Sequence, residues 1–278
     1  MRPALVVRRA ADYLSRHDVE APLPTAEILM ASVLGTDRAG VYARDDGLST
    51  AEAKRFGRAL CQRCTGVPLQ HLTGDQPFRR LTLIVRPGVF IPRQETEIVV
   101  EHALAAVDGV AAPVVVDVGT GTGAIALTIK DERPDARVVA IDVSPEAVEL
   151  ARENATGSGL DVEVVRGDLL DAVPAVLRGS VDLVVSNPPY VEPHEIATLP
   201  REVLADPMPA LAGGIEVYER LFAQAADVLR PGGAVVVEIG ESQGPRVRAA
   251  ATAARFVSVE VEHDLNGRDR IVTGRTPT

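Results

Sequence analysis

From residue 114 onward, the sequence alternates between short β-branched runs and helical segments. The five runs, each four to six residues long, are residues 114–118, 137–141, 162–165, 181–185 and 234–239. Strands that alternate with helices in this way favour an open, mostly parallel sheet with helices on both faces. A chain of 278 residues with 46% hydrophobic residues can bury such a sheet.

Two further runs, residues 256–261 and 270–273, are joined by an Asp-Leu-Asn-Gly stretch at 264–267. Runs connected by so short a turn predict an antiparallel hairpin at the edge of the sheet. The predicted fold class is therefore α/β, with a mostly parallel seven-stranded sheet and an antiparallel edge hairpin. Aromatic residues are only 3% of the chain, which agrees with a core of Val, Leu, Ile and Ala.

The start of the chain has a different pattern, with helices separated by short breakers. Helices are expected near residues 3–14, 25–34 and 49–64, and a Ser-x-x-Glu capping box at residues 49–52 opens the last of them. This module either packs as an appendage or recognises a partner, and its own residues show no constellation with a chemical function.

Between the two regions, apolar and polar residues alternate over residues 81–86 and a Pro-Gly turn follows, which is typical of a strand or hairpin. We therefore predict an N-terminal helical domain at 1–75, a hairpin linker at 76–92 and an α/β domain at 93–278.

The charge of the chain is acidic, with 29 Lys and Arg against 39 Asp and Glu. The excess lies in residues 79–278, and no long basic run occurs in either part. Proteins that grip a nucleic-acid backbone usually show a cationic surface, so this balance argues against direct nucleic-acid binding. No apolar run approaches the ~20 residues of a membrane span. Arginines interrupt the apolar start, so no signal peptide is readable and a cytoplasmic protein is expected.

The two cysteines, Cys61 and Cys64, form a lone C-x-x-C motif. A metal site would need further ligands, and His71 is the one nearby candidate; a redox motif would need an adjacent βαβ pattern. Two thiols one helical turn apart are the better interpretation, so we expect no metal.

A glycine-rich turn follows the first of the five runs. It consists of Gly119, Thr120, Gly121, Thr122 and Gly123. Glycines at such a position permit a tight turn and let a ligand approach the backbone and the helix N-terminus. The spacing of these glycines also satisfies the fingerprint of dinucleotide-binding proteins. The turn by itself therefore does not distinguish a dinucleotide from another ligand.

Asp117, two residues before the first glycine, favours a cationic ligand over a dinucleotide. A carboxylate there would repel a pyrophosphate and attract a cation, such as the ammonium group of S-adenosylmethionine. Asp142 directly follows the second run, where it can accept hydrogen bonds from ribose hydroxyls or belong to the turn before a helix. Asp168 and Leu169 follow the third run and are expected near the adenine, although Asp168 could equally be an ordinary loop carboxylate.

The fourth run ends abruptly at Asn187, Pro188, Pro189 and Tyr190. The prolines have no N–H to donate, so the turn presents mainly acceptors, namely Asn187 Oδ1 and neighbouring carbonyls. A planar group with two N–H donors would fit there, with the Tyr190 ring against its face. The alternative is a tight turn that only caps a strand.

Four further stretches accompany these two turns. They are Pro-Leu-Gln-His-Leu-Thr-Gly at 68–74, Phe-Ile-Pro-Arg-Gln-Glu-Thr-Glu at 90–97, Ala-Leu-Ala-Gly-Gly at 210–214 and Asp-Leu-Asn-Gly-Arg-Asp-Arg at 264–270. With them, the sequence resembles the HemK/PrmC family, which methylates the glutamine side-chain amide nitrogen in the Gly-Gly-Gln motif of peptide-chain release factors.

The resemblance implies a Rossmann-like class I methyltransferase fold, an N-terminal domain that recognises the substrate, and S-adenosylhomocysteine as product. By the family's pattern, residues 119–123, Asp142 and Asn187 contact the cofactor, while residues 187–190 contact the glutamine. Leu169 departs from the pattern, because many members have an aromatic residue there. A release factor is then the expected partner of a monomeric enzyme.

Two other functions remain open at this point. A nucleic-acid base methyltransferase would use the same tetrapeptide, but it should show a basic cleft and a means of flipping bases. A non-catalytic cofactor-binding module would not need the Asn-Pro-Pro-Tyr turn.

Overall fold

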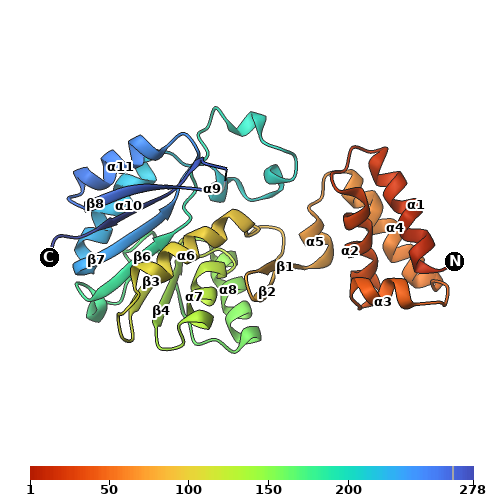
Figure 1. Cartoon of the computed structure of the whole chain (residues 1–278), viewed down its shortest axis with the longest axis horizontal. Coiled ribbons are helices and arrows are strands. Elements are labelled where there is room, and N and C mark those ends of the chain that lie inside the picture. Colours follow the sequence, from red (N-terminus) through yellow and green to blue (C-terminus); the bar gives the residue numbers. More distant parts are fainter. Residues whose placement is uncertain (265) are drawn as a thin grey trace. The chain divides into compact units, whose positions relative to one another are not determined.

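The computed structural model describes residues 1–264 and 266–278, which form two compact units. The first unit comprises Met1–Asp75 and the short segment Pro200–Ala205, and the second comprises Gln76–Leu199 and Asp206–Thr278. Figure 1 shows the helices of the first unit in red and orange and the sheet of the second in yellow to blue. Each unit has a hydrophobic core of its own.

The helical unit contains α1 (Pro3–Ser15), α2 (Pro22–Leu34), α3 (Arg38–Ala43), α4 (Thr50–Cys64) and α5 (Leu69–Thr73). The first, second and fourth correspond to the helices expected from the sequence, whereas α3 and α5 are short and were not expected. Buried apolar side chains from α1, α2 and α4 form the core, among them Val7, Leu14, Leu29, Met30 and Phe56.

The expected capping box opens α4. Ser49 Oγ accepts from the backbone N–H of Glu52 (3.2 Å), and Glu52 accepts from the backbone N–H of Ser49 (2.7 Å). At the other end of α4, the buried guanidinium of Arg63 forms an ion pair with Glu202. This ion pair holds the Pro200–Ala205 segment within the helical unit.

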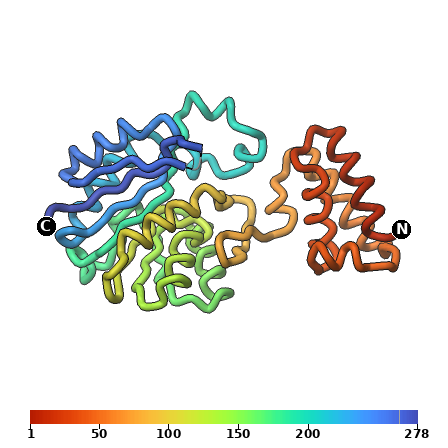
Figure 2. The backbone as a smooth tube through the Cα atoms, in the orientation of Figure 1, coloured from red at the N-terminus to blue at the C-terminus, as the bar shows by residue number. Residues whose placement is uncertain are grey.

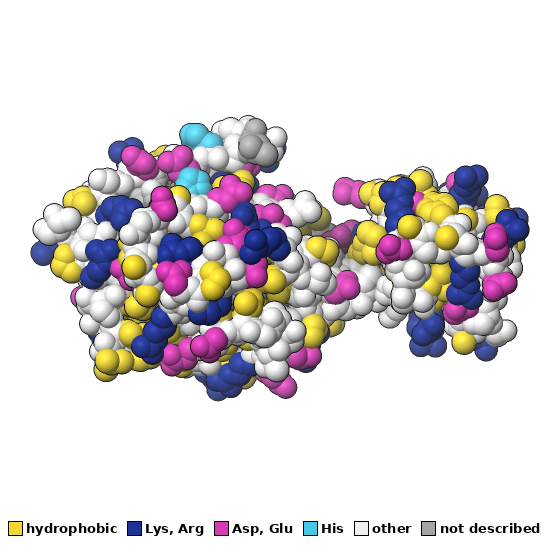
Figure 3. Space-filling view, turned by 60° about the horizontal axis from the view of Figure 1, so that its bottom comes forward, with side chains coloured by type: hydrophobic (Ala, Val, Ile, Leu, Met, Phe, Trp, Pro, Cys, Tyr) yellow, Lys and Arg dark blue, Asp and Glu magenta, His cyan; other side chains and the backbone are white. Residues whose placement is uncertain are grey.

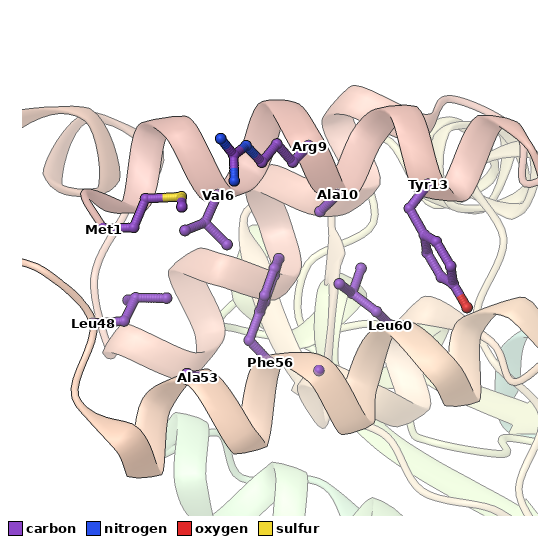
Figure 4. Close-up of a pocket in the computed structure, with 10 residues that line it drawn as sticks. Met1, Val6, Arg9, Ala10, Tyr13, Leu48, Ala53, Phe56 and Leu60 are labelled. Atoms are coloured by element: carbon purple, nitrogen blue, oxygen red, sulfur yellow. The ribbon is translucent and has the colours of Figure 1, made fainter.

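A pocket of about 440 Å³ lies between α1 and α4. Figure 4 shows its lining, which is mainly apolar and includes Val6, Ala10, Phe56 and Leu60, with Arg9 on α1 as the charged member. The helical unit therefore has an accessible apolar depression beside a cationic side chain.

The second unit is built on a seven-stranded sheet with the order β5-β4-β3-β6-β7-β9-β8. The strands are β3 (Val114–Val118), β4 (Arg137–Asp142), β5 (Glu163–Arg166), β6 (Val181–Ser186), β7 (Leu229–Glu238), β8 (Val257–His263) and β9 (Asp269–Arg275). β3 to β7 pair in parallel, and β9 pairs antiparallel with both β7 and β8. The predicted mostly parallel sheet with an antiparallel edge hairpin is confirmed; Leu265 in the hairpin turn lies outside the described residues.

Helices cover both faces of this sheet, as Figures 1 and 2 show. One face packs against α6 (Glu97–Ala106), α7 (Ala124–Glu132) and α8 (Pro145–Ser158), and the other against α10 (Ile215–Val228) and α11 (Gly244–Ala253). Successive side chains of a strand point to opposite faces of the sheet. Val115 packs in the core under α6, α7 and α8, and Val116 in the core under α10 and α11. Because both faces are covered, the central strands are mostly apolar, although β3 contains Asp117 and β6 contains Asp182.

The two-stranded sheet of β1 (Asp75–Phe78) and β2 (Leu81–Ile84) follows the helical unit. Its turn lies at Arg79 and Arg80, where Arg79 has a positive φ of 49°. Phe78 and Leu83 are almost fully buried in the core of the α/β unit. Residues 76–84 of the expected linker are therefore anchored in the second unit.

Strand order changes direction at the middle of the large sheet. The chain runs from β3 to β4 and β5 on one side, then returns to β6 on the other side of β3. In open α/β sheets ligands bind outside the carboxyl ends of the strands at such a point. Among the described helices, none is both long and apolar enough to cross a membrane.

The buried side-chain amide of Asn154 on α8 links the end of β2 at Ile84 to the glycine turn at Thr122. It accepts from the N–H of Ile84 (2.7 Å) and donates to the carbonyls of Ile84 (3.1 Å) and Thr122 (2.9 Å). Asn154→Ala leaves these groups unpaired, and the free energy of unfolding should fall by about 2–4 kcal/mol in urea denaturation. Glu149→Ala, at an exposed position of the same helix, should change it by less than about 0.5 kcal/mol. Equal effects of the two variants would contradict the bridging role.

Candidate active site

The glycine turn and the Asn-Pro-Pro-Tyr turn begin side by side. β3 and β6 are adjacent parallel strands in which Val118 is paired with Ser186, so both chains leave the sheet at the same edge. Ser186 Oγ donates to the carbonyl of Val118 (2.7 Å). A Cβ added to Gly119 would lie 4.0 Å from the carbonyl oxygen of Asn187. The two turns that the sequence singled out therefore lie next to each other at one edge of the sheet.

Backbone hydrogen bonds fasten the glycine turn to the end of β4. The N–H groups of Gly119 and Thr120 both donate to the carbonyl of Ile141, at 2.8 and 3.0 Å. The three glycines of the turn have positive φ values of 70°, 57° and 87°, which side-chain-bearing residues rarely adopt. The glycine requirement at residues 119, 121 and 123 is therefore conformational, and the turn directs its backbone toward the sheet edge.

Asp117 lies fully buried beneath the glycine turn. Its Oδ2 accepts from Thr120 Oγ1 (2.6 Å) and from the N–H of Ala126 (3.2 Å), whereas its Oδ1 has no partner among the described residues. Burial raises the pKa of this carboxyl to about 7, and the two hydrogen bonds oppose that rise. The side chain thus braces the turn with one oxygen and leaves a buried acceptor that suits a cationic ligand group.

Asp142, at the end of β4, is half-buried beside the same turn. Its Oδ2 accepts from the N–H of Gly121 (2.9 Å) and its Oδ1 from the N–H of Ser144 (2.9 Å). Burial raises the pKa of the carboxyl. Ser144, not Asp142, caps α8 by accepting from the N–H of Ala147 (3.2 Å). Each carboxylate oxygen keeps a lone pair for a ligand hydroxyl.

Asp168 and Leu169 follow β5 and lie next to this corner, because the N–H of Gly167 donates to the carbonyl of Asp142 (2.9 Å). The Asp168 side chain is exposed and pairs with Arg220 on α10 (2.6 Å). Leu169 is half-buried, has a positive φ of 49° and packs against the apolar core under α10. The segment presents an aliphatic side chain and an ion-paired carboxylate.

In the Asn-Pro-Pro-Tyr turn, Pro188 is buried, whereas Asn187, Pro189 and Tyr190 are half-buried. Asn187 Nδ2 donates to Thr96 Oγ1 (3.1 Å). The carbonyl of Tyr190 accepts from Gln243 Nε2 (2.8 Å), and the Tyr190 hydroxyl donates to Glu238 Oε1 (3.3 Å). No described residue donates to Asn187 Oδ1 or to the Pro188 carbonyl. The turn therefore keeps the two acceptors that the sequence predicted.

Gly213 holds the Pro189 carbonyl in place through close backbone contact. A Cβ at position 213 would lie only 1.8 Å from the Pro189 oxygen. The N–H of Gly213 donates to the carbonyl of Val191 (3.0 Å), and the N–H of Val191 donates to the carbonyl of Leu211 (2.9 Å). The Ala-Leu-Ala-Gly-Gly stretch is thus a brace for the tetrapeptide, and glycine is required there for space.

The same loop is tied to the chain before α6. The buried carboxyl of Asp206 accepts from the N–H of Ile91 (3.0 Å) and forms an ion pair with Arg93. Burial raises the pKa of this carboxyl, and Arg93 opposes the rise. The Ile-Pro-Arg stretch therefore anchors the entry to the 3-10 helix η1 (Gln94–Thr96), which carries Thr96 to Asn187.

Sequence analysis missed Glu238 and gave Thr96 no role. Glu238 ends β7, and Thr96 lies between Glu95 and Glu97, whose carboxylates suit the N-terminal turn of the helix that follows. Thr96 Oγ1 donates to Glu238 Oε2 (2.7 Å), and both side chains are buried. An acidic residue at the end of an otherwise apolar strand was the available signal.

Cys61 is exposed and Cys64 is half-buried, and both are free thiols. Within residues 1–264 and 266–278, no group of three or more His, Cys, Asp or Glu side chains is arranged to hold a metal ion.

Comparisons with known proteins bear on both units. A family model described as the PrmC N-terminal domain matches residues 6–74, and one described as the methyltransferase small domain matches residues 80–214. A release factor glutamine methyltransferase of Moorella thermoacetica is 42% identical over 94% of this chain and 94% of its own length. One from Mycolicibacterium smegmatis is 43% identical over 96% and 95%.

Among solved structures, a T. thermophilus 16S rRNA methyltransferase in complex with AdoMet and guanosine has a TM-score of 0.54 and 19% identity, and the match covers 73% of this chain and 49% of that chain. At this identity the match supports the methyltransferase fold alone.

The buried carboxyl of Asp117 generates a pH prediction. Because its pKa is raised to about 7, the folded protein holds a proton between about pH 4 and pH 7 that the unfolded chain has lost. The free energy of unfolding should therefore fall as pH rises through that window. Asp117→Asn should reduce the fall between pH 5 and pH 8 in urea denaturation. Asp168→Asn, at an exposed site, is the control; an unchanged fall in Asp117→Asn would contradict the argument.

The contact at Gly213 generates a packing prediction. Gly213→Ala must push the Pro189 carbonyl aside, so the free energy of unfolding should fall by about 1–3 kcal/mol. Gly157→Ala, on α8 with nothing within 4 Å of the added Cβ, should instead raise it by about 0.5–1 kcal/mol. Denaturant titration of both variants measures the difference. Equal midpoints would show that the position 213 backbone moves without cost.

Proposed function

This chain belongs to the release factor glutamine methyltransferase family, and we propose that it methylates the side-chain amide nitrogen (N5) of the glutamine in the Gly-Gly-Gln motif of peptide-chain release factors. The observation that carries the proposal is the turn with two unpaired acceptors beside the glycine turn of a methyltransferase fold. S-adenosylmethionine is the methyl donor, and S-adenosylhomocysteine is the product.

The residues around the glycine turn suit this cofactor. The unpartnered Oδ1 of Asp117 is a buried acceptor for the ammonium group, and that cation would favour the charged carboxylate that burial disfavours. Asp142 would accept from the ribose hydroxyls, and the backbone of residues 119–123 would line the methionine portion. Asp168 and Leu169 would lie by the adenine, with an aliphatic contact in place of an aromatic one.

When bound, S-adenosylmethionine supplies an electrophilic methyl group. A primary amide nitrogen is a poor nucleophile because its lone pair is delocalised into the carbonyl, so the protein must orient and polarise it. Asn187 Oδ1 and the Pro188 carbonyl would accept hydrogen bonds from the two N–H groups of the substrate amide. These acceptors would also stabilise the positive charge that develops on the nitrogen. Pro189 shapes the turn, and the Tyr190 ring would orient the planar amide.

No strong base is needed at this position. The nitrogen becomes acidic once the methyl group has been transferred, and its proton can then leave to solvent. Asn187 would therefore act through hydrogen bonding and placement. Its carbonyl lies 4.0 Å from a Cβ built on Gly119, which supports a further contact of Asn187 with the cofactor.

We further propose that the helical domain recognises the release factor. Its apolar pocket beside Arg9 offers a surface for a protein. Figure 3 shows one face of the molecule with basic and acidic side chains interspersed, which suits a protein substrate better than nucleic acid. We propose a cytoplasmic monomer that does not bind nucleic acid directly.

Mass spectrometry tests the function directly. Enzyme and S-adenosylmethionine are incubated with an intact release factor, a Gly-Gly-Gln peptide, DNA or RNA. A single added methyl group on the Gly-Gly-Gln glutamine is expected, with faster transfer to the intact factor if the helical domain recognises it. Methylation of DNA or RNA alone would overturn the proposal.

Asn187→Ala should lower the rate of methyl transfer about 100-fold or more, because one acceptor for the substrate amide is lost. Binding of S-adenosylmethionine, followed by calorimetry, should persist. Asn266→Ala, which removes an exposed amide at the sheet edge, is the matched control and should transfer methyl groups at the wild-type rate. Near-normal transfer by a folded Asn187→Ala enzyme would refute this mechanism.

A further inference from the structure

Glu238 is linked to both ends of the Asn-Pro-Pro-Tyr turn by hydrogen bonds, directly to Tyr190 and through Thr96 to Asn187. Its Oε1 accepts from the Tyr190 hydroxyl (3.3 Å), and its Oε2 accepts from Thr96 Oγ1 (2.7 Å). Thr96 in turn accepts from Asn187 Nδ2 (3.1 Å). β7 is the parallel neighbour of β6, so this carboxyl lies at the end of the strand beside the tetrapeptide. One buried carboxyl thus reaches the first and last residues of the turn.

The direction of these hydrogen bonds is set by the number of hydrogens available. A threonine hydroxyl has one hydrogen to donate, and an ionised carboxylate can only accept. While Glu238 is ionised, it accepts a hydrogen bond from the Thr96 hydroxyl. Thr96 then has no hydrogen left to donate and can only accept from Asn187. The Asn187 amide must therefore turn its Nδ2 toward Thr96, which leaves Oδ1 on the opposite side of the amide.

We propose that Glu238 and Thr96 are positioning residues that hold the Asn187 amide with its Oδ1 available to the substrate nitrogen, while Glu238 also holds the Tyr190 ring. This inference rests on the proposed function. This role requires no contact of either residue with the substrate or the cofactor. The pair acts through Asn187, because a reversed amide would present a donor to an amide nitrogen that itself only donates.

A purely structural role predicts different behaviour. The Tyr218 hydroxyl on α10 donates to the backbone carbonyl of Glu238 (2.9 Å), so this strand end is also part of the core. If the Glu238 carboxyl served stability alone, its loss would change the free energy of unfolding without changing the rate of the transfer step in molecules that remain folded.

The pH dependence of catalysis separates these roles. Burial raises the pKa of Glu238 to about 7; the hydrogen bonds from Thr96 and Tyr190 and the charge of Arg270 on β9 oppose this rise, and Glu95 in η1 adds to it. Tyr218 also faces the group, and burial raises its pKa far above this range. A protonated Glu238 can donate to Thr96, which frees the Thr96 hydrogen for Asn187 Oδ1 and lets the amide reverse. The wild-type kcat should therefore fall as pH drops through about 7.

The decisive variants are Thr96→Val, which removes the hydroxyl from a side chain of the same shape, and Thr96→Ser, which keeps it. With release factor and S-adenosylmethionine both saturating, Thr96→Val should lower kcat about 10- to 100-fold, since small misplacements of a reacting group cost that much. The KM for S-adenosylmethionine should change little. Thr96→Ser should restore most of the lost rate. Wild-type kcat in Thr96→Val, or no restoration in Thr96→Ser, would overturn the proposal.

A double-mutant cycle measures the coupling between Thr96 and Asn187 in the rate of methyl transfer, which a purely structural role of Thr96 would not produce. If Thr96 acts only through Asn187, adding Thr96→Val to Asn187→Ala should cost at most about twofold more in rate than Asn187→Ala alone. Additive losses would mean that Thr96 acts by another route and would overturn the proposal.

Glu238→Gln provides an independent test should Thr96→Val fail to fold. Because glutamine does not titrate, kcat of this variant should be flat through pH 7, and it should be below the high-pH value of the wild type. A pH profile that still falls like that of the wild type would overturn the proposal. The wild-type control also keeps the two ideas separate: no release factor methylation by wild-type enzyme refutes the function, whereas wild-type activity with insensitive variants refutes only the positioning role.

Discussion

The parallel pairing of β3 with β6 is the constraint on which the site depends. These strands are distant in sequence, yet their register places Val118 beside Ser186 and so brings two turns of different chemistry to one edge. One turn approaches a ligand through glycine backbone, and the other presents carbonyl and amide oxygens. Neither turn forms a methyl-transfer site alone, because the donor and the acceptor nitrogen must lie in line.

Two buried carboxyls support these turns from below. Asp117 braces the glycine turn and Glu238 braces the tetrapeptide, and burial raises the pKa of each to about 7. Desolvating a carboxylate is unfavourable to folding, so each position retains its charge only at a cost in stability. Each charge has a place in the roles proposed above: Asp117 Oδ1 has no partner among the described residues and could accept from a cation, and Glu238 accepts from the Thr96 hydroxyl.

Much of the fold could be predicted from local sequence, since β-branched runs, glycine turns and proline stops reflect short-range conformational preferences. The limits of the prediction follow from long-range contacts. Thr96 and Glu238 are 142 residues apart and meet through strand order. The motif at residues 210–214 marks Gly213 without a reason for glycine, and the reason is a tertiary contact, since a side chain there would collide with the Pro189 carbonyl. α3 and α5 were too short to have a clear periodic pattern.

The sequence by itself determined the strand runs, the glycine turn and the unpaired acceptors of the Asn-Pro-Pro-Tyr turn, because these depend on each residue's own donors, acceptors and allowed torsions. Tertiary structure decided which way the Asn187 amide faces. That choice depends on the Thr96 hydroxyl, which donates its one hydrogen to Glu238 and therefore accepts from Asn187, and only the packed sheet brings those three side chains together.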